Sequence, residues 1–134
     1  MDPLSITASV IAILTLTTEV ISYIQVATGA PKEWRQYAIE ALNIQTLLTN
    51  LRFHLEDADI NDPWFKSVAT LRIKDGPLDQ FEAALRLLKS KVSVETDTVK
   101  RMLWKLNKAE ADSVVQRMER LKSLVNVALE MDHL

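Results

Sequence analysis

The chain has 134 residues, of which 48% are apolar and 25% are charged, and its formal net charge is −2. This length suits one domain with a single core, and the small net charge excludes the global basic field that draws proteins to nucleic acid. The absence of cysteine excludes disulfides and thiolate chemistry, and two glycines are too few for a phosphate-binding glycine loop.

The first predicted helix, residues 2–28, is apolar almost all round, and Asp2 and Glu19 are its only charges. Asp2 followed by proline is a good N-terminal cap, and Gly-Ala-Pro at 29–31 is a typical stop. Such a helix is either buried in a core or enters a membrane. It is long enough to span a bilayer, but its serines and threonines dilute its hydrophobicity. The residues alone therefore favour a buried core helix at rest, with insertion as a second state.

Later helices are predicted from caps and periodicity. One covers residues 32–58, and Asp62-Pro63 then begins a short helix. Another helix follows Asp75-Gly76-Pro77, a further short one covers residues 99–106, and Asn107 with Glu110 forms a capping-box-like start for the last. The core-facing stripes are predicted as Ile6, Val10, Ile13, Leu16, Val20, Ile24 and Ala27; Trp34, Ala38, Ala41, Leu42, Leu48, Leu51 and Leu55; Leu78, Phe81, Leu85, Leu88 and Val92; and Ala111, Val115, Met118, Leu121, Val125, Ala128 and Leu129.

These segments predict an all-α fold, an antiparallel helical bundle of four to five main helices plus a short helix. The first helix is expected to be the central one, because only a helix that is contacted on several sides can be apolar all round. No segment alternates with period two between turn signals, so strands are not expected.

Catalytic and metal-binding motifs are not evident. The two histidines, His54 and His133, have no serine or cysteine nucleophile in a recognised motif nearby. The acidic stretch 56–62 lacks the glycine and the terminal glutamate of a calcium loop and is better explained as a solvated loop. An enzyme, a metal site and a cofactor are therefore not expected.

A basic stretch near the C-terminal third is interleaved with apolar residues, and its cations are Lys100, Arg101, Lys105 and Lys108. A short basic amphipathic helix of this kind can contact anionic lipids. An ordinary solvated helix face is the favoured interpretation from the residues alone, lipid contact comes second, and nucleic-acid binding is the weakest.

Several motifs together suggest a family: residues 1–9, Ala30-Pro31-Lys32, residues 47–52, Asp62-Pro63-Trp64, residues 76–81, and the C-terminal segments 117–124 and 128–134. In this order and spacing they resemble the HeLo-like N-terminal domain of fungal STAND (NOD-like) receptors. The resemblance covers essentially the whole chain, so residues 1–134 are expected to be a single HeLo-like domain excised from a longer receptor, with a nucleotide-binding module in cis.

The resemblance implies a function. HeLo-like domains are similar to the HET-S HeLo domain and to the four-helix bundle of the mixed lineage kinase domain-like pseudokinase, which execute programmed cell death. By this resemblance the chain is cytoplasmic at rest, self-associates on activation and permeabilises the plasma membrane, as in heterokaryon incompatibility and innate immunity. The membrane-inserting candidates are Leu4, Ile6, Val10, Ile11, Ile13, Leu14 and Leu16. The alternative is a soluble homotypic adaptor that signals without inserting.

Overall fold

The computed structural model describes residues 3–26, 30–59, 61–92 and 106–131, and all structural statements below concern these residues. The described chain is helical and contains no strand, so the prediction of an all-α helical bundle is confirmed for it. The elements are α1 (Pro3–Val26), α2 (Lys32–Asp57), α3 (Pro63–Ala69), the 3₁₀ turn η1 (Thr70–Arg72), α4 (Pro77–Val92) and α5 (Lys108–Met131).

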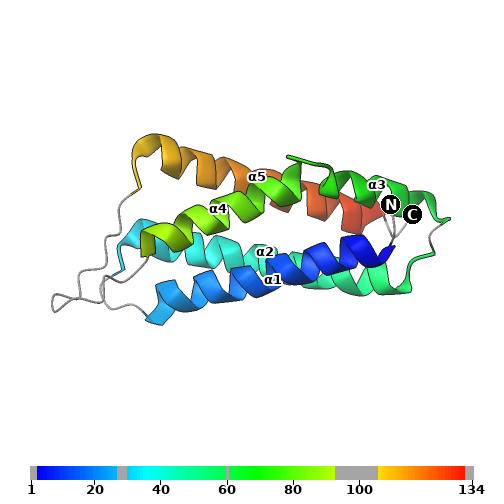
Figure 1. The fold of residues 1–134 in the computed structure, drawn as a ribbon, viewed down its shortest axis with the longest axis horizontal. Coiled ribbons are helices and arrows are strands. Elements are labelled where there is room, and N and C mark those ends of the chain that lie inside the picture. The colour runs from blue at the N-terminus through cyan, green and yellow to red at the C-terminus, as the bar shows by residue number, and fades with distance from the viewer. Residues whose placement is uncertain (1–2, 27–29, 60, 93–105, 132–134) are drawn as a thin grey trace.

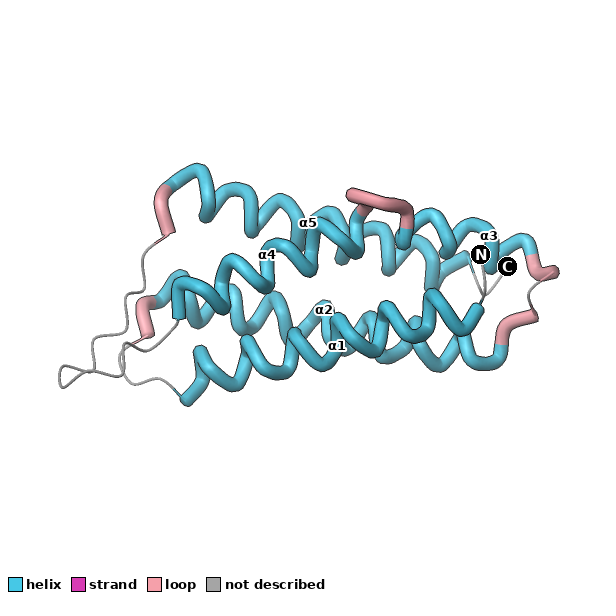
Figure 2. The backbone as a smooth tube through the Cα atoms, in the orientation of Figure 1, coloured by secondary structure: helices cyan, strands magenta, loops and turns pink. Residues whose placement is uncertain are grey.

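The four long helices surround one core (Figure 1). Helix α1 packs against α2 and α4, and α5 packs against the same two helices from the other side. The short α3 lies against α5 near the ends of the chain, and η1 connects it to α4. Figure 2 shows that the described loops are short relative to the helices they join. Because α1 and α5 each pack against both α2 and α4, they lie at opposite corners of the bundle.

Two predicted N-terminal caps are confirmed by hydrogen bonds. The backbone N–H of Trp64 donates to the Asp62 carboxylate over 3.0 Å at the start of α3. At the start of α5, the Asn107 N–H donates to Glu110 and the Glu110 N–H donates to the Asn107 side chain, over 3.0 and 2.8 Å. Each cap satisfies N–H groups that have no partner within the helix. The predicted cap at Asp2 and almost all of the predicted helix at 99–106 lie outside the described residues.

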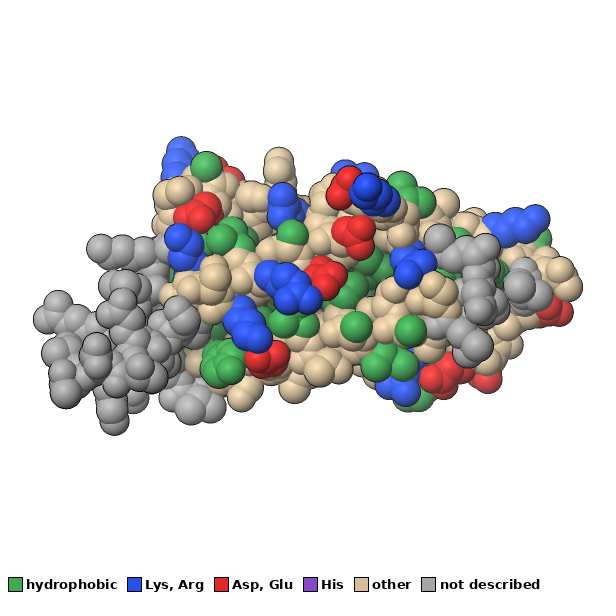
Figure 3. Space-filling view, viewed as in Figure 1, with side chains coloured by type: hydrophobic (Ala, Val, Ile, Leu, Met, Phe, Trp, Pro, Cys, Tyr) green, Lys and Arg blue, Asp and Glu red, His purple; other side chains and the backbone are tan. Residues whose placement is uncertain are grey.

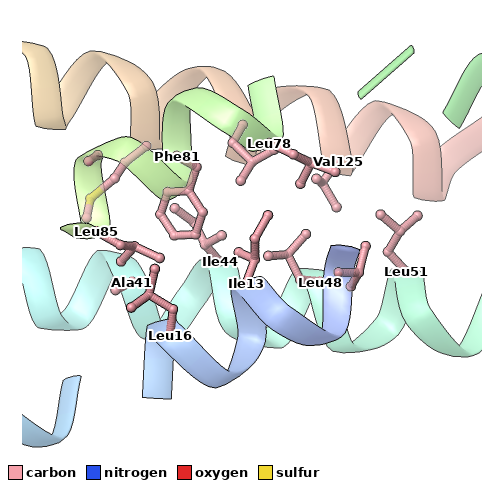
Figure 4. Packing of buried hydrophobic residues seen from close by; sticks show 14 of the residues in the cluster. Ile13, Leu16, Ala41, Ile44, Leu48, Leu51, Leu78, Phe81, Leu85 and Val125 are labelled. Carbon is pink, nitrogen blue, oxygen red and sulfur yellow. The ribbon is translucent and has the colours of Figure 1, made fainter. Parts of the chain in front are cut away.

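Most of the predicted stripes form the core. Figure 4 shows Ile13 of α1 meeting Ile44 of α2 and Phe81 of α4, with Val125 of α5 beside them. The prediction is wrong for two residues, because Leu42 and Val115 were placed in the core stripes and each is 46% exposed. In their place Ile44 and Val114 are buried. One residue step turns a helix by about 100°, so a small error in the stripe moves a side chain from the core to the surface.

The prediction that α1 is central is also wrong. Helix α1 lies at a corner of the bundle, where α2 and α4 contact it and its remaining side is exposed. Three threonine hydroxyls donate to carbonyls one turn earlier in α1, namely Thr15 to Ile11, Thr17 to Ile13 and Thr18 to Leu14. Because these hydroxyls are satisfied within the helix and are also tolerated by water, a helix without charges does not have to be covered on every side.

Candidate membrane-active helix

Helix α1 is the one described element that is long and apolar enough to cross a membrane. The candidate span Ser5–Gln25 has a mean hydropathy of 1.6, and 39% of its most apolar window is buried within the bundle. Length and composition alone are weak evidence, because the core helix of a soluble protein passes the same test. The arrangement of its faces and contacts therefore decides what the helix can do.

The inner face of α1 is an apolar stripe formed by Ile6, Val10, Ile13, Leu16, Val20, Ile21 and Ile24, and the buried Thr17 is its one polar member. All seven side chains are buried in the common core. At about 1.5–3 kcal/mol for each buried aliphatic side chain, the stripe stabilises the docked position of α1 by roughly 10–20 kcal/mol, as an upper estimate. The resting fold therefore holds α1 chiefly through apolar contact.

The outer face of α1 is exposed and carries a single charge, Glu19, among small or uncharged side chains that include Ala8, Ile11, Ala12, Thr15 and Ser22. In Figure 3 the surface over α1 is mostly polar-neutral and apolar, whereas basic and acidic side chains are interspersed over α4. Ordinary surface helices carry charges on this side. The outer face of α1 is therefore unusual in carrying a single charge, which is paired with Lys89 of α4.

The seven residues predicted to insert do not form one surface. Ile6, Val10, Ile13 and Leu16 are buried, Leu14 is half-buried, and Ile11 is exposed. The side chain of Leu4 lies outside the described residues. The helix would therefore have to leave α2 and α4 before most of these side chains contacted lipid.

Three side-chain contacts fasten α1 to its neighbours. Lys89 Nζ of α4 lies 2.7 Å from Glu19 Oε1, the only charged side chain of α1. Arg72 Nε of η1 donates to Ser9 Oγ over 2.6 Å, and Gln45 Nε2 of α2 donates to Thr18 Oγ1 over 2.5 Å. Glu19 and Lys89 are 38% and 41% exposed, so their pair contributes at most about 1 kcal/mol. These contacts set the orientation of α1 more than its stability.

The predicted anionic-lipid site is described at one residue. Lys108 is exposed at the first position of α5, while Lys100, Arg101 and Lys105 lie outside the described residues. The basic surface therefore stays a prediction.

Other sequence candidates have structural roles. Trp34 is buried with its ring 5.8 Å from that of Tyr37, and the indole N–H of Trp64 donates to the Ala128 carbonyl over 2.7 Å. The His54 ring lies 6.3 Å from the Trp64 ring at the end of α2. No group of three or more metal-ligating side chains occurs among the described residues. Trp104 and His133 lie outside them.

One surface was missed from the sequence. The outer face of α2 carries three large exposed apolar side chains, Ile39, Leu42 and Phe53. The signal was present, because these residues recur at helical spacing on the side opposite the core stripe, but Leu42 was counted within that stripe.

Comparison with known proteins adds no relative: no protein-family model matches the chain, and neither a curated protein nor a solved structure matches it. The described residues form an all-α helical bundle, and among them α1 is the helix that is both long and apolar enough to span a membrane.

Proposed function

We propose that this chain is a HeLo-like, membrane-targeting cell-death effector domain of a fungal NLR-like receptor, folded as an antiparallel bundle and inserting through its N-terminal helix. Activation clusters the domains, α1 leaves the bundle, and its two faces enter the plasma membrane. The partners in this proposal are anionic lipids, further copies of the chain and a nucleotide-binding module in cis.

The observation that carries the proposal is the chemistry of the exposed side of α1. A surface helix normally presents several charges to water, but the exposed side of α1 carries only Glu19. The hydroxyls of Thr15, Thr17 and Thr18 are hydrogen-bonded within the helix, as a bilayer requires of polar groups. Apart from Glu19, both faces therefore suit the hydrocarbon core.

The energetics of release depend on the destination. In water, undocking α1 would expose the whole buried stripe, which the apolar contacts of the bundle oppose. In a bilayer the same side chains pass from one apolar environment to another, so most of that cost disappears. The remaining costs are the loss of packing, the exposure of the α2 and α4 faces that α1 covered, and the burial of Glu19, about 3 kcal/mol for an acidic side chain at the centre of a membrane helix.

Dye release from anionic liposomes tests the proposal. Ala12 is exposed near the middle of the candidate span, so Ala12→Asp adds a charge to α1 without entering the core. Ala83 is exposed within α4, and Ala83→Asp makes the same change on another helix. We expect clustered wild-type protein and Ala83→Asp to release dye, and Ala12→Asp to release far less.

The structure also dictates which variant to avoid. Ile13 is only 4% exposed, so Ile13→Asp would bury a charge and unfold the bundle, and a loss of leakage would then say nothing about insertion. Leakage by Ala12→Asp equal to that of the wild type would remove α1 as the inserting element. Absence of leakage from the clustered wild type would reject the membrane function.

The second candidate is a soluble homotypic adaptor in which α1 stays docked. The complete burial of the seven-residue inner stripe favours it, because that stripe gives α1 a stable place in the bundle. The adaptor requires self-association without dye release. The same liposome assay therefore separates the two candidates.

A further inference from the structure

The outer face of α2 carries a seam with coiled-coil spacing, made of Ile39, Leu42, Thr46, Thr49 and Phe53. The steps between successive members are three, four, three and four residues, which is the spacing of positions that face a partner helix. Phe53 is 58% exposed, Ile39 is 51% exposed and Leu42 is 46% exposed, so the seam presents three large apolar side chains on one helix face. This seam faces away from the core of its own bundle.

The charges at the two ends of the seam have opposite signs. On the seam side, Lys32 and Arg35 lie at the N-terminal end of α2 and Asp57 lies at its C-terminal end, whereas Glu33 lies towards Tyr37 and Glu56 is paired with Arg52. Between them, the groove that α2 forms with α1 is lined by uncharged side chains except at Arg52. Two copies aligned in parallel would bring like charges together, but two antiparallel copies bring opposite charges together. The seam is therefore complementary to itself in one orientation only.

A hollow beside the seam is suited to an apolar knob. Its volume is about 590 Å³, and its lining includes Ile24 of α1, Ala38, Ile39 and Leu42 of α2, and Arg35 at one side. We place the two-fold axis of the antiparallel pair midway between residues 47 and 48 of α2. In this register Leu42 lies level with the partner's Phe53, and Thr46 lies level with the partner's Thr49. The same alignment brings Arg35 within about one helical turn of the partner's Asp57.

We propose that two copies of this chain dock antiparallel through the α2 seam, each inserting Phe53 into the hollow beside Leu42 of the other. The seam from Arg35 to Asp57 is about 33 Å long, and with the adjoining strip of α1 it is about 20 Å wide. That gives roughly 660 Å² per copy and about 1,300 Å² in total, which is within the range of specific interfaces. The expected dissociation constant is on the order of 1–100 µM.

This docking concerns the resting domain in solution, and it does not rest on membrane activity. Sedimentation equilibrium of the 134-residue chain without lipid tests it. We expect a monomer–dimer equilibrium. A chain that stays monomeric at concentrations well above about 100 µM overturns the proposal and leaves the liposome result unaffected.

Substitutions at the seam test the surface. Phe53→Ser should weaken association by roughly tenfold or more, because Phe53 is the aromatic side chain that enters the partner's hollow. Val127 is an exposed apolar residue on α5, and Val127→Ser should leave association unchanged. Both positions are exposed, so both variants should keep the helical circular dichroism of the wild type. Equal weakening by the two variants, or by neither, overturns the seam as the interface.

Charge reversal tests the orientation. Arg35→Glu should weaken the dimer by several-fold, because it places two acidic groups together in the antiparallel pair. Adding Asp57→Arg in the same chain should restore the affinity, since the glutamate introduced at position 35 of each copy then faces the arginine introduced at position 57 of the other. In a parallel dimer the double variant restores nothing, and that result would overturn the antiparallel arrangement.

Discussion

Weakening the inner stripe of α1 without adding a charge should promote membrane activity. Val20 of α1 and Val125 of α5 are the same residue type, and both are completely buried in the core. Truncation of either to alanine removes two methyl groups and leaves a small cavity, which costs about 2 kcal/mol of unfolding free energy. The two variants are therefore matched in chemistry and in stability, and they differ in which helix they loosen.

The two variants should differ in liposome leakage. If α1 must undock, Val20→Ala raises the population of the released state by roughly 30-fold, which is the Boltzmann factor for about 2 kcal/mol. The loss of hydrophobicity costs the inserted helix only a few tenths of a kcal/mol. Val125→Ala weakens the α5 side of the core and should change leakage much less.

The assay pairs urea unfolding with dye release at the same protein concentration. Urea titration first establishes that the two variants lose similar free energies of unfolding. Equal leakage from both would mean that permeabilisation follows global unfolding, and would refute the selective release of α1. Unchanged leakage from Val20→Ala would show that undocking does not limit the process.

Three further predictions concern the Glu19–Lys89 ion pair, the buried Tyr37 hydroxyl and the turn at Gly76. The chain has no cysteine, so a double variant with Glu19→Cys and Lys89→Cys can be cross-linked between these two positions by a short bismaleimide. The cross-linked protein should lose dye release, because α1 can no longer leave α4. The same variant treated with a monofunctional maleimide should keep dye release. Burial raises the pKa of the Tyr37 hydroxyl above its ordinary value of 10.0. Above about pH 10 the unfolded chain therefore loses this proton more readily than the folded chain, and the free energy of unfolding falls as the pH rises. Urea titrations at several alkaline pH values should show a shallower fall for Tyr37→Phe, and an equal slope would contradict the assignment. A Cβ at Gly76 would lie 2.6 Å from Ile73 Cγ1 and 2.8 Å from the Ile73 carbonyl oxygen. Gly76→Ala should therefore destabilise the turn before α4 by about 1–3 kcal/mol, measured as a lower Tm, and an unchanged Tm would show that the turn relaxes freely.

The helix starts could be predicted because their signals are local. Asp62 and Asn107 are recognisable caps, and each makes the expected hydrogen bond to the first turn of its helix. The stripes of α1 and α4 were also predictable, because their apolar residues recur at regular spacing. These features depend on residues within a few positions of one another.

The rotation of α2 and α5 was harder to predict, because both helices have apolar residues on more than one side. Leu42 and Val115 each belong to a plausible stripe, but packing against α1, α4 and the opposite helix selects the neighbouring stripe. The contact between Glu19 and Lys89 was likewise unpredictable from the sequence, because the two residues lie 70 positions apart in the chain.

For α1, the sequence by itself determined the length, the low charge and the inner stripe, since these follow from residue order and the 3.6-residue helical period. The tertiary structure decided that the helix occupies a corner and keeps one side in water. A helix with few charges has no strong polar face to indicate which side is exposed, so its orientation depends on the neighbours against which it packs. In this bundle α2 and α4 cover the isoleucine and valine stripe, and the outer face, with Glu19 as its one charge, remains exposed.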